Sequence, residues 1–462
     1  MATTPAEFKE QARKNAGDAR LKEIVRKATT HSLKKRAEVV AEVPDWEELR
    51  QSGHEIRREA VENLASYLEQ FEQRCTANGV HVLWANDSAE ACAHVERIVG
   101  ETRSQHIVKS KSMVTEEIGL NEYLGHRGIE SVETDLGEYI VQLAGETPSH
   151  ITAPALHKSR EDIGKLFAEK LGVPYTSDPS QLTAQARSLL REKFLGADVG
   201  ISGANFLVAE TGTVVIVENE GNACLTTALP KVHIVVTGIE KVVPRLADAA
   251  TLLRLLPRSA TGQRITSYIS FITSPRKQSE TDGPEQLFVI LVDNKRSEVL
   301  AEPAMRESLY CIRCGACMNV CPVYQTVGGH AYGSTYPGPI GAVVTPLLTS
   351  LSESRSLPFA SSLCGACSEI CPVKIDLHHL LLQFRGEAVS RRLTPMTERI
   401  AIHLWRWAMK SSVAYALLSR LIRLVAPEKL NVPVWSVGRE MAPLAPRTFH
   451  DIWKSSLESE MR

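Results

Sequence analysis

The spacing of hydrophobic and polar positions changes near residue 60 of this 462-residue chain. Before that point, stretches such as ARLKEIVRKATTHSLKKRAEVV place apolar residues at helical spacing among many charged ones. After it come short apolar runs that end in polar or turn-forming residues: VHVLWAND, HIVKSKS, EYIVQLA, GTVVIVEN, KVHIVVTG and LFVILVDN. Such runs are typical of β-strands. We therefore expect residues 1–60 to form a helical segment packed on a body that contains a sheet.

Helical stretches lie between several of these runs, for example EEIGLNEYLGHRG and SREDIGKLFAEKLG. Strands that alternate with helices predict an α/β domain with a largely parallel sheet. Strands of such a sheet are buried on both faces, so they read as continuous apolar runs. The polar stretch SPRKQSETDGPEQ is followed by another apolar strand, and we interpret it as a loop within the domain.

Charge and composition narrow the class of protein. The formal net charge of -1 argues against a nucleic-acid partner, because a phosphate-binding surface usually carries a basic excess. No apolar run approaches the roughly 18 residues of a membrane-spanning helix. The opening MATTPAEFKEQARKNAG lacks the apolar segment of a secretory signal. We expect a cytoplasmic protein.

Seven of the ten cysteines lie between Cys311 and Cys371, too few in too long a chain for a secreted disulfide framework. The run CIRCGACMNVCP has the C-x2-C-x2-C-x3-C-P spacing of bacterial ferredoxins. A zinc site would instead need four ligands in two pairs. The remaining cysteines are expected to be small buried apolar residues: Cys75, Cys92 and Cys224.

A second run, SSLCGACSEICP, has three cysteines where the first has four, and Ser361 stands in the first ligand position. In two-cluster ferredoxins the last cysteine of a run ligates the other cluster. This crossing predicts cluster 1 on Cys311, Cys314, Cys317 and Cys371, and cluster 2 on Cys321, Cys364 and Cys367. Cluster 2 is then either a [4Fe–4S] cluster with one labile iron and a weaker oxygen ligand or a [3Fe–4S] cluster.

The predicted domains are a helical segment at 1–60, the α/β domain at 61–298, a mainly helical two-cluster ferredoxin-type domain at 299–378 and a helical tail at 379–462. The tail contains the amphipathic stretch AIHLWRWAMKSSVAYALLSRLIRLV. It suits a membrane surface, a partner helix or packing on its own domain, and we favour the last.

Two further stretches offer polar groups for a site. KSKSM follows a strand and opens a helix, so Lys109, Lys111 and Ser112 are candidates for holding an anion. The stretches AETGTVV and NEGN contribute Glu210, Thr211, Gly212, Glu220, Gly221 and Asn222. Solvated lysines and ordinary turns explain the same residues slightly better. His378 and His379 are expected at the surface or beside a cluster rather than as ligands.

The whole chain resembles the lactate utilization protein B family. The stretches VKSKSMVTEEIGLNEYLGHRGIE and ISGANFLVAETGTVVIVENEGNACLTTALPKVHIVVTGIEKVVP resemble its LUD domain, and both cysteine runs resemble its cluster loops. The resemblance implies a LUD domain similar to the sugar-isomerase and formyl-tetrahydrofolate cyclo-ligase fold. It also implies two [4Fe–4S] clusters on the seven cysteines, and a role in oxidising L-lactate to pyruvate with two companion proteins.

Three functions fit these observations. The first is an electron-transfer subunit of a lactate-oxidising system, since no G-x-G-x-x-G fingerprint for a flavin or nicotinamide opens a strand–helix unit here. The second is catalysis by the LUD domain itself on a small hydroxy acid. The third is a redox-sensing regulator, for which a DNA-binding element would be expected and none is evident.

Overall fold

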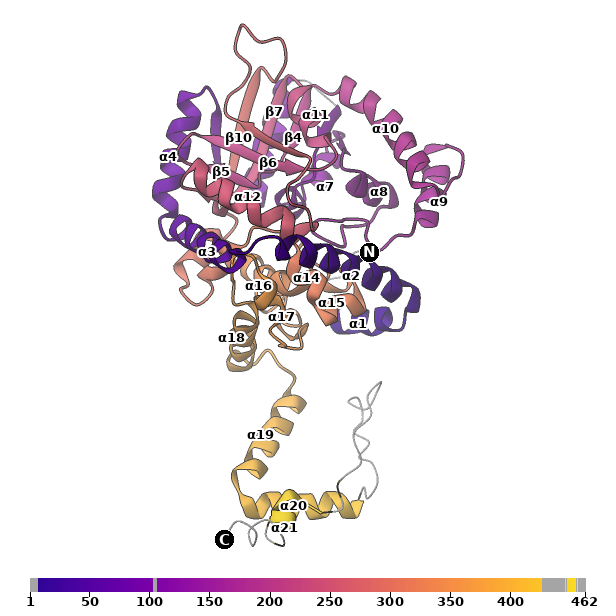
Figure 1. Cartoon of the computed structure of the whole chain (residues 1–462), viewed down its shortest axis with the longest axis vertical. Coiled ribbons are helices and arrows are strands. Elements are labelled where there is room, and N and C mark those ends of the chain that lie inside the picture. The colour runs from indigo at the N-terminus through magenta and orange to yellow at the C-terminus, as the bar shows by residue number, and fades with distance from the viewer. Residues whose placement is uncertain (1–6, 103–105, 426–444, 446, 454, 456–462) are drawn as a thin grey trace. The chain divides into compact units, whose positions relative to one another are not determined.

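The computed structural model describes residues 7–102, 106–425, 445, 447–453 and 455. The chain forms two compact units, Met1–Ala388 and Val389–Arg462, which are treated separately below. The first unit contains both the α/β domain and the cysteine region (Figure 1). The predicted limit near residue 379 falls inside helix α18 (Leu377–Ser390), whose buried apolar residues belong to the first unit up to Ala388.

A six-stranded sheet with the order β1-β10-β7-β4-β2-β3 forms the centre of the α/β domain. All its pairings are parallel, which confirms the predicted parallel sheet. Its strands are β1 His81–Ala85, β2 His106–Lys109, β3 Glu130–Glu133, β4 Val199–Ser202, β7 Val232–Gly238 and β10 Gln286–Val292. Beside it lies a four-stranded sheet with the order β8-β5-β6-β9, made of β5 Phe206–Val208, β6 Thr213–Glu218, β8 Val242–Val243 and β9 Tyr268–Ile272.

Hydrophobic cores cover both faces of the parallel sheet. On one face Ile290 belongs to a cluster with Val95 of α5 (Ser88–Thr102). On the other face Val289 belongs to a cluster with Phe71 of α4 (Leu64–Ala77). Neighbouring residues of one strand point to opposite faces, so a strand covered on both sides must be apolar throughout. This is why LFVILVDN shows no alternation.

The predicted strand EYIVQLA is wrong, because this stretch lies in helix α8 (Leu136–Ala144). The Asp135 carboxylate accepts the backbone N–H of Glu138 at the start of the helix, and Gly145 ends it in the left-handed conformation. A seven-residue apolar run fits a buried strand or a buried helix equally well. Here the capping residues at the two ends, Asp135 and Gly145, favour the helix.

The remaining helices of the α/β domain surround the sheets and include α9, which the stretch SREDIGKLFAEKLG predicts. The predicted helix EEIGLNEYLGHRG is two short helices, because Gly119 has a positive φ of 67° between them. The bounds are α6 Met113–Glu117, α7 Leu120–Gly125, α9 Arg160–Leu171, α10 Pro179–Gly196, α11 Asn222–Ala228, α12 Leu246–Ala260 and α13 Arg296–Ala301.

The cysteine region is built from short helices, and the N-terminal helices lie against it (Figure 1). Its helices are α14 Ala316–Val320, α15 Pro322–Val327, α16 Gly338–Leu348 and α17 Ala366–Ile370, followed by α18. The N-terminal helices are α1 Phe8–Ala16, α2 Ala19–Ala41 and α3 Trp46–Glu62. Helix α2 packs on α14 and α15, and α3 packs on the 3-10 turn Arg306–Tyr310 that leads into the first cysteine run.

The second unit contains α19 (Met396–Lys410), α20 (Ser412–Val425) and α21 (Phe449–Ile452). Helices α19 and α20 contact each other, yet large apolar side chains on both stay exposed, among them Trp405, Trp407 and Leu424. Part of the predicted tail, at 426–444, 446, 454 and 456–462, lies outside the described residues. Among the described helices none is long and apolar enough to cross a membrane.

Candidate functional site

The two cysteine runs repeat one backbone conformation. Arg313 and Leu363 both have positive φ angles, of 59° and 55°, and Gly315 and Gly365 follow with 77° and 82°. A short helix then begins in each run, α14 in the first and α17 in the second. Side chains other than glycine rarely adopt positive φ, so sharing it at matching positions marks a structural repeat. The repeat aligns Cys311 with Ser361.

A small cavity of about 20 Å³ is lined by four of the cysteines: Cys311, Cys314, Cys317 and Cys371. Three of these thiols are buried and Cys311 is half-buried. Burial and the neighbouring Cys371 thiol raise the pKa of Cys314. Cys371 comes from the second run, so the structure brings together the four thiols that the crossed arrangement predicts for cluster 1.

The other three cysteines of the runs are Cys321, Cys364 and Cys367. Burial raises the pKa of Cys367 to about 11, with the nearby thiols of Cys321 and Cys364 adding to the shift. Cys364 is exposed, whereas Cys321 and Cys367 are buried. Two groups of soft thiol donors at ferredoxin spacing fit iron–sulfur clusters.

Ser361 takes the place in the second run that Cys311 has in the first. The backbone N–H of Arg313 donates to the Cys311 Sγ at 3.4 Å, and that of Leu363 donates to the Ser361 Oγ at 3.1 Å. The serine hydroxyl therefore occupies the position of a ligand thiol relative to its run. The same bond also caps the turn, which is the local role expected of a serine without a metal.

Arginines of the N-terminal helices hold the cysteine loops, which sequence reasoning missed. Arg50 donates to the carbonyl oxygen of Cys371 through Nε at 3.0 Å and Nη2 at 2.8 Å. Arg57, 1% exposed, donates to the carbonyl oxygens of Leu309 at 3.0 Å and Tyr310 at 3.3 Å. The sequence did contain one indication of this role. Arg50 and Arg57 are seven residues apart, which places both side chains on one face of helix α3.

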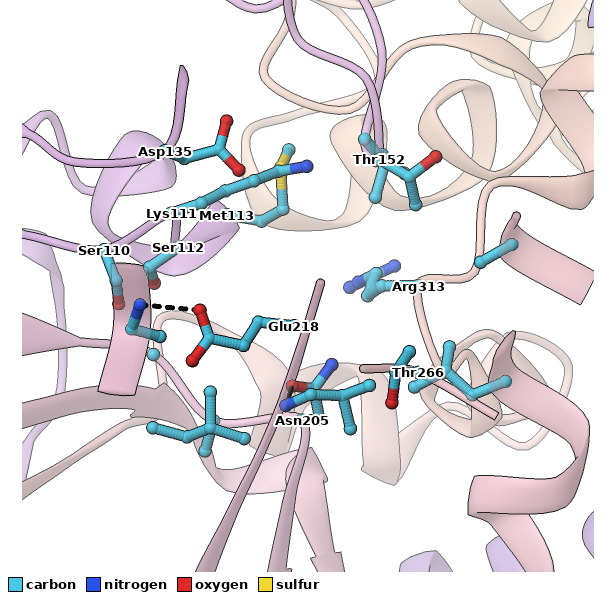
Figure 2. A pocket seen from close by; sticks show the side chains of 18 of the residues that line it. Ser110, Lys111, Ser112, Met113, Asp135, Thr152, Asn205, Glu218, Thr266 and Arg313 are labelled. Carbon is cyan, nitrogen blue, oxygen red and sulfur yellow. Dashed lines mark hydrogen bonds between the residues drawn. The ribbon is translucent and has the colours of Figure 1, made fainter. Parts of the chain in front are cut away.

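A larger cavity, of about 260 Å³, opens at the carboxyl ends of the parallel strands (Figure 2). Lys111 follows β2, Asp135 follows β3, Gly203 follows β4 and Lys241 follows β7. The opposite wall includes Arg313, from the first cysteine run, and Tyr336. Open α/β sheets bind their ligands at this edge. The cavity therefore lies between the α/β domain and the first cysteine loop.

The structure places two of the three KSKSM candidates, Lys111 and Ser112, at this cavity. Lys109 is buried and forms an ion pair with Glu133 at 2.7 Å, so it does not reach the cavity. Ser112 lines the cavity but also accepts the backbone N–H of Thr115 as the N-cap of α6. Helix α6 has five residues, too short to form an anion site by itself. Lys111 is the lysine of this stretch that lines the cavity.

Of the candidates from AETGTVV and NEGN, some line the cavity and others lie away from it. Glu220 and Asn222 line the cavity, and Gly221 precedes α11 with a positive φ of 77°. The other three form the turn between β5 and β6: Glu210, Thr211 and Gly212. A Cβ at Gly212 would lie 2.7 Å from the backbone nitrogen of Cys75, so this glycine allows the turn to approach helix α4.

The cation Lys241 was not among the candidates, although it follows the strand KVHIVVTG. Its side chain lines the cavity, and burial lowers its pKa to about 8 while the nearby Glu240 carboxylate opposes that shift. Arg313 was also missed. It lies between two cysteines of the first run, where the residues between ligands need not have a role of their own. Its guanidinium lies 4.5 Å from the ring centroid of Tyr336 and 3.9 Å from the Glu240 carboxylate.

A buried ionic network fixes this wall of the cavity. Arg296, 1% exposed, pairs with Glu240 at 2.5 Å and with both carboxylate oxygens of Glu117 at 2.8 Å. The Tyr336 hydroxyl donates to Glu117 at 2.6 Å. The network thus ties the α/β domain to Tyr336, on which Arg313 stacks.

The remaining candidates lie outside both thiol groups. His379 is exposed and hydrogen-bonds to the Asp376 carboxylate just after the second run. His378 is half-buried, and its Nδ1 lies 2.8 Å from the Ser368 hydroxyl and 2.9 Å from the Asp376 carboxylate. Cys75 and Cys92 are buried, as predicted. Cys224 is half-buried instead, and its Sγ lies 3.4 Å from the Ser270 hydroxyl.

Family models match both parts of the first unit. Residues 68–292 match the LUD domain, and residues 307–375 match the 4Fe-4S dicluster domain. The chain is 46% identical over 433 residues to lactate utilization protein B of Anoxybacillus flavithermus, covering 93% of this chain and 91% of that protein. It is 46% identical over 415 residues to the Bacillus subtilis protein of the same name, covering 89% and 86%.

One solved structure is also similar, that of a DUF162 family protein from Deinococcus radiodurans. It is 15% identical, covers 50% of this chain and 98% of its own, and has a TM-score of 0.28. A TM-score this low carries no argument about the fold.

Proposed function

Because this chain belongs to the lactate utilization protein B family, we propose that it is the electron-transfer subunit of a system oxidising L-lactate to pyruvate, working with companion subunits. Family membership and the dicluster match give the coarser role, iron–sulfur chemistry in lactate utilization. The observation that carries the proposal is the cavity lined by Cys311, Cys314, Cys317 and Cys371. The cytoplasm stays the location predicted from the sequence.

In this proposal two clusters lie side by side with crossed ligands. Cluster 1 is held by Cys311, Cys314, Cys317 and Cys371, and cluster 2 by Cys321, Cys364 and Cys367. When bound, such clusters accept and release single electrons at potentials set by charge, hydrogen bonds and exposure.

The chain's own residues give the two sites different surroundings. Buried Cys314, Cys317 and Cys371 would exclude water from cluster 1, whereas exposed Cys364 leaves cluster 2 within reach of a redox partner. Arg50 and Arg57 hold the loops that position the thiols. We therefore expect electrons to leave the chain through cluster 2.

The test is anaerobic mixing of the reconstituted protein with its companion subunits and L-lactate. Loss of the visible absorption of oxidised clusters is expected only when the companions are present. The Cys364→Ala variant should show reduced transfer to an external acceptor, because cluster 2 is damaged.

Two results would contradict the proposal. If the clusters remain oxidised in the complete lactate-oxidising system, they do not carry electrons from lactate. The same conclusion follows if the complex oxidises lactate equally well with the cluster-free chain.

A further inference from the structure

Three cationic side chains line the 260 Å³ cavity, and the described part of the chain leaves donors of each without a hydrogen-bond partner. Lys241 is 7% exposed, yet among the described residues its ammonium makes no hydrogen bond or ion pair, and the same holds for Lys111. The Nη1 of Arg313 is buried and also has no hydrogen-bond partner within the described chain. A buried cation costs free energy unless an anion or acceptor meets it. Lys241 is the buried member of the three, while Lys111 and Arg313 are half-buried and Arg313 faces the Glu240 carboxylate at 3.9 Å, beyond hydrogen-bond distance. All three can therefore still donate hydrogen bonds to an anionic ligand.

Three carboxylates of the same cavity each accept backbone N–H groups of the protein. Glu218 accepts the backbone N–H groups of Ala223 and Cys224, each at 2.7 Å. Asp135 and Glu220 each accept one backbone N–H at 3.1 Å. The acidic groups thus already have hydrogen-bond partners in the protein, whereas Lys111, Lys241 and the Arg313 Nη1 have none among the described residues. The unused donors of the cavity are therefore cationic, and an anion is the ligand that would meet them.

We propose that this cavity binds a small 2-hydroxy or 2-oxo carboxylic acid, with its carboxylate on Lys111, Lys241 and Arg313. Figure 2 shows Lys111 and Arg313 pointing into the cavity from opposite walls, with Glu218 below Lys111 in the view. The Glu218 Oε1 accepts one backbone N–H, from Cys224, and a carboxylate oxygen can accept two hydrogen bonds, so a substrate hydroxyl has an acceptor in the same cavity. The choice of a hydroxy or oxo acid rests on the proposed function; the choice of an organic anion rests on the charges.

The size of the cavity agrees with this ligand class. A cavity of about 150 Å³ holds benzene, and pockets for drug-sized ligands begin at about 300 Å³. A volume of about 260 Å³ therefore suits a small acid together with some water. The carboxyl ends of four parallel strands supply the lining, the edge at which open α/β sheets bind ligands.

Binding at this place would be linked to cluster 1. Arg313 lies in sequence between Cys311 and Cys314, so a carboxylate beside it offsets a positive charge close to the cluster. The reduced cluster carries one more negative charge, so the bound acid should lower its reduction potential. By reciprocity, reduction of the cluster should weaken binding of the acid.

The test is calorimetric titration of the full-length, anaerobically reconstituted protein with L-lactate, pyruvate and inorganic phosphate. Lys241→Met and Lys111→Met should each weaken pyruvate or lactate binding by about tenfold or more, the effect of one charged hydrogen bond. Lys111→Arg should restore part of the affinity. Lys231→Met is the matched control, since Lys231 is an exposed lysine at the opposite end of β7 from Lys241.

Each outcome decides the matter. Carboxylate binding that is weakened in both methionine variants and kept in the control supports the site. No binding of either acid, unchanged affinity in both variants, or binding of phosphate alone would overturn it. Lys111 is half-buried, so its variant remains informative if Lys241→Met fails to fold.

A second measurement separates this inference from the proposed function. Potentiometric titration with and without pyruvate should shift cluster 1 to lower potential, and Lys231→Met should keep that shift. If the acid does not bind while the complete system still reduces the clusters with lactate, the site is wrong and the electron-transfer role stands. If the acid binds but lactate never reduces the clusters, the reverse holds.

Discussion

Arg50 of helix α3 donates two hydrogen bonds, at 3.0 and 2.8 Å, to the carbonyl oxygen of Cys371. The same guanidinium donates to the carbonyl oxygen of Glu369 at 2.7 Å. The N-terminal helical segment therefore holds the loop that delivers the second-run cysteine to the first-run thiols. It also places a positive charge, 8% exposed, beside that site.

Arg50→Met should lower the reduction potential of cluster 1 by roughly 50 mV, because a nearby cation favours the more negative reduced state. Arg50→Lys keeps the charge but loses the two-pronged contact, so it should restore the potential and leave the cluster easier to lose. The measurement is a redox titration followed by electron paramagnetic resonance.

Arg58→Met is the control for Arg50, since Arg58 is exposed on the same helix. A potential that is unchanged in Arg50→Met, or that shifts equally in Arg58→Met, would contradict the role given to Arg50.

Ser361→Cys should make cluster 2 more resistant to oxygen. The Ser361 Oγ occupies the place of the Cys311 Sγ relative to its run, so a thiolate there would supply the fourth ligand. A serine oxygen or water holds iron in a sulfide cluster less well than sulfur does. The rate of conversion to a three-iron spectrum in air should fall.

Ser352→Cys provides the comparison, because Ser352 is exposed and lies outside both cysteine runs. Equal conversion rates for wild type and Ser361→Cys, with cluster 2 intact, would show that Ser361 does not face the iron.

Glu138→Gln should stabilise the protein more at about pH 8 than at about pH 5. Glu138 is 3% exposed, its Oε1 has no hydrogen-bond partner in the described chain, and burial raises its pKa to about 8. The folded state therefore holds a proton that the unfolded chain releases above its ordinary carboxyl pKa, so Glu138 lowers stability progressively as the pH rises toward 8. Glutamine has no titratable proton, so the variant should not lose stability in this way as the pH rises.

Thermal unfolding of wild type and Glu138→Gln across this pH range gives the difference in Tm. The exposed Glu122→Gln should show no such trend. A difference in Tm that does not grow with pH would mean that Glu138 is not held protonated.

The sequence predicted those features that depend on residues close together in the chain. Cysteine spacing, read with the crossed arrangement of ferredoxins, predicted which four thiols lie around one small cavity. Parallel strands such as LFVILVDN were recognisable because burial on both faces makes them apolar throughout. The β3 and β4 strands were missed; each has four residues, as has β2, which the run HIVKSKS did indicate. The strand prediction for EYIVQLA was wrong because so short an apolar run does not distinguish the periodicity of a helix from that of a strand.

The cavity depends on tertiary placement that no local pattern contains. Lys109 and Lys111 are two residues apart in one polar stretch, yet the first is paired inside the fold and the second lines the cavity. Lys241 and Arg313 come from different domains and meet only when the first cysteine loop closes on the sheet. Arg50 likewise gains its role from packing across more than 300 residues of sequence.

The most direct measurement is the spectrum of Cys371→Ala, reconstituted anaerobically and reduced, beside those of Cys314→Ala and Cys364→Ala. Wild type should hold about eight irons per chain, or about seven if cluster 2 has three irons. Cys371→Ala should change the same cluster signal as Cys314→Ala and leave the signal affected by Cys364→Ala intact. A wild type with four or fewer irons, or a Cys371→Ala variant that changes only the Cys364-dependent signal, would contradict two clusters with crossed ligands.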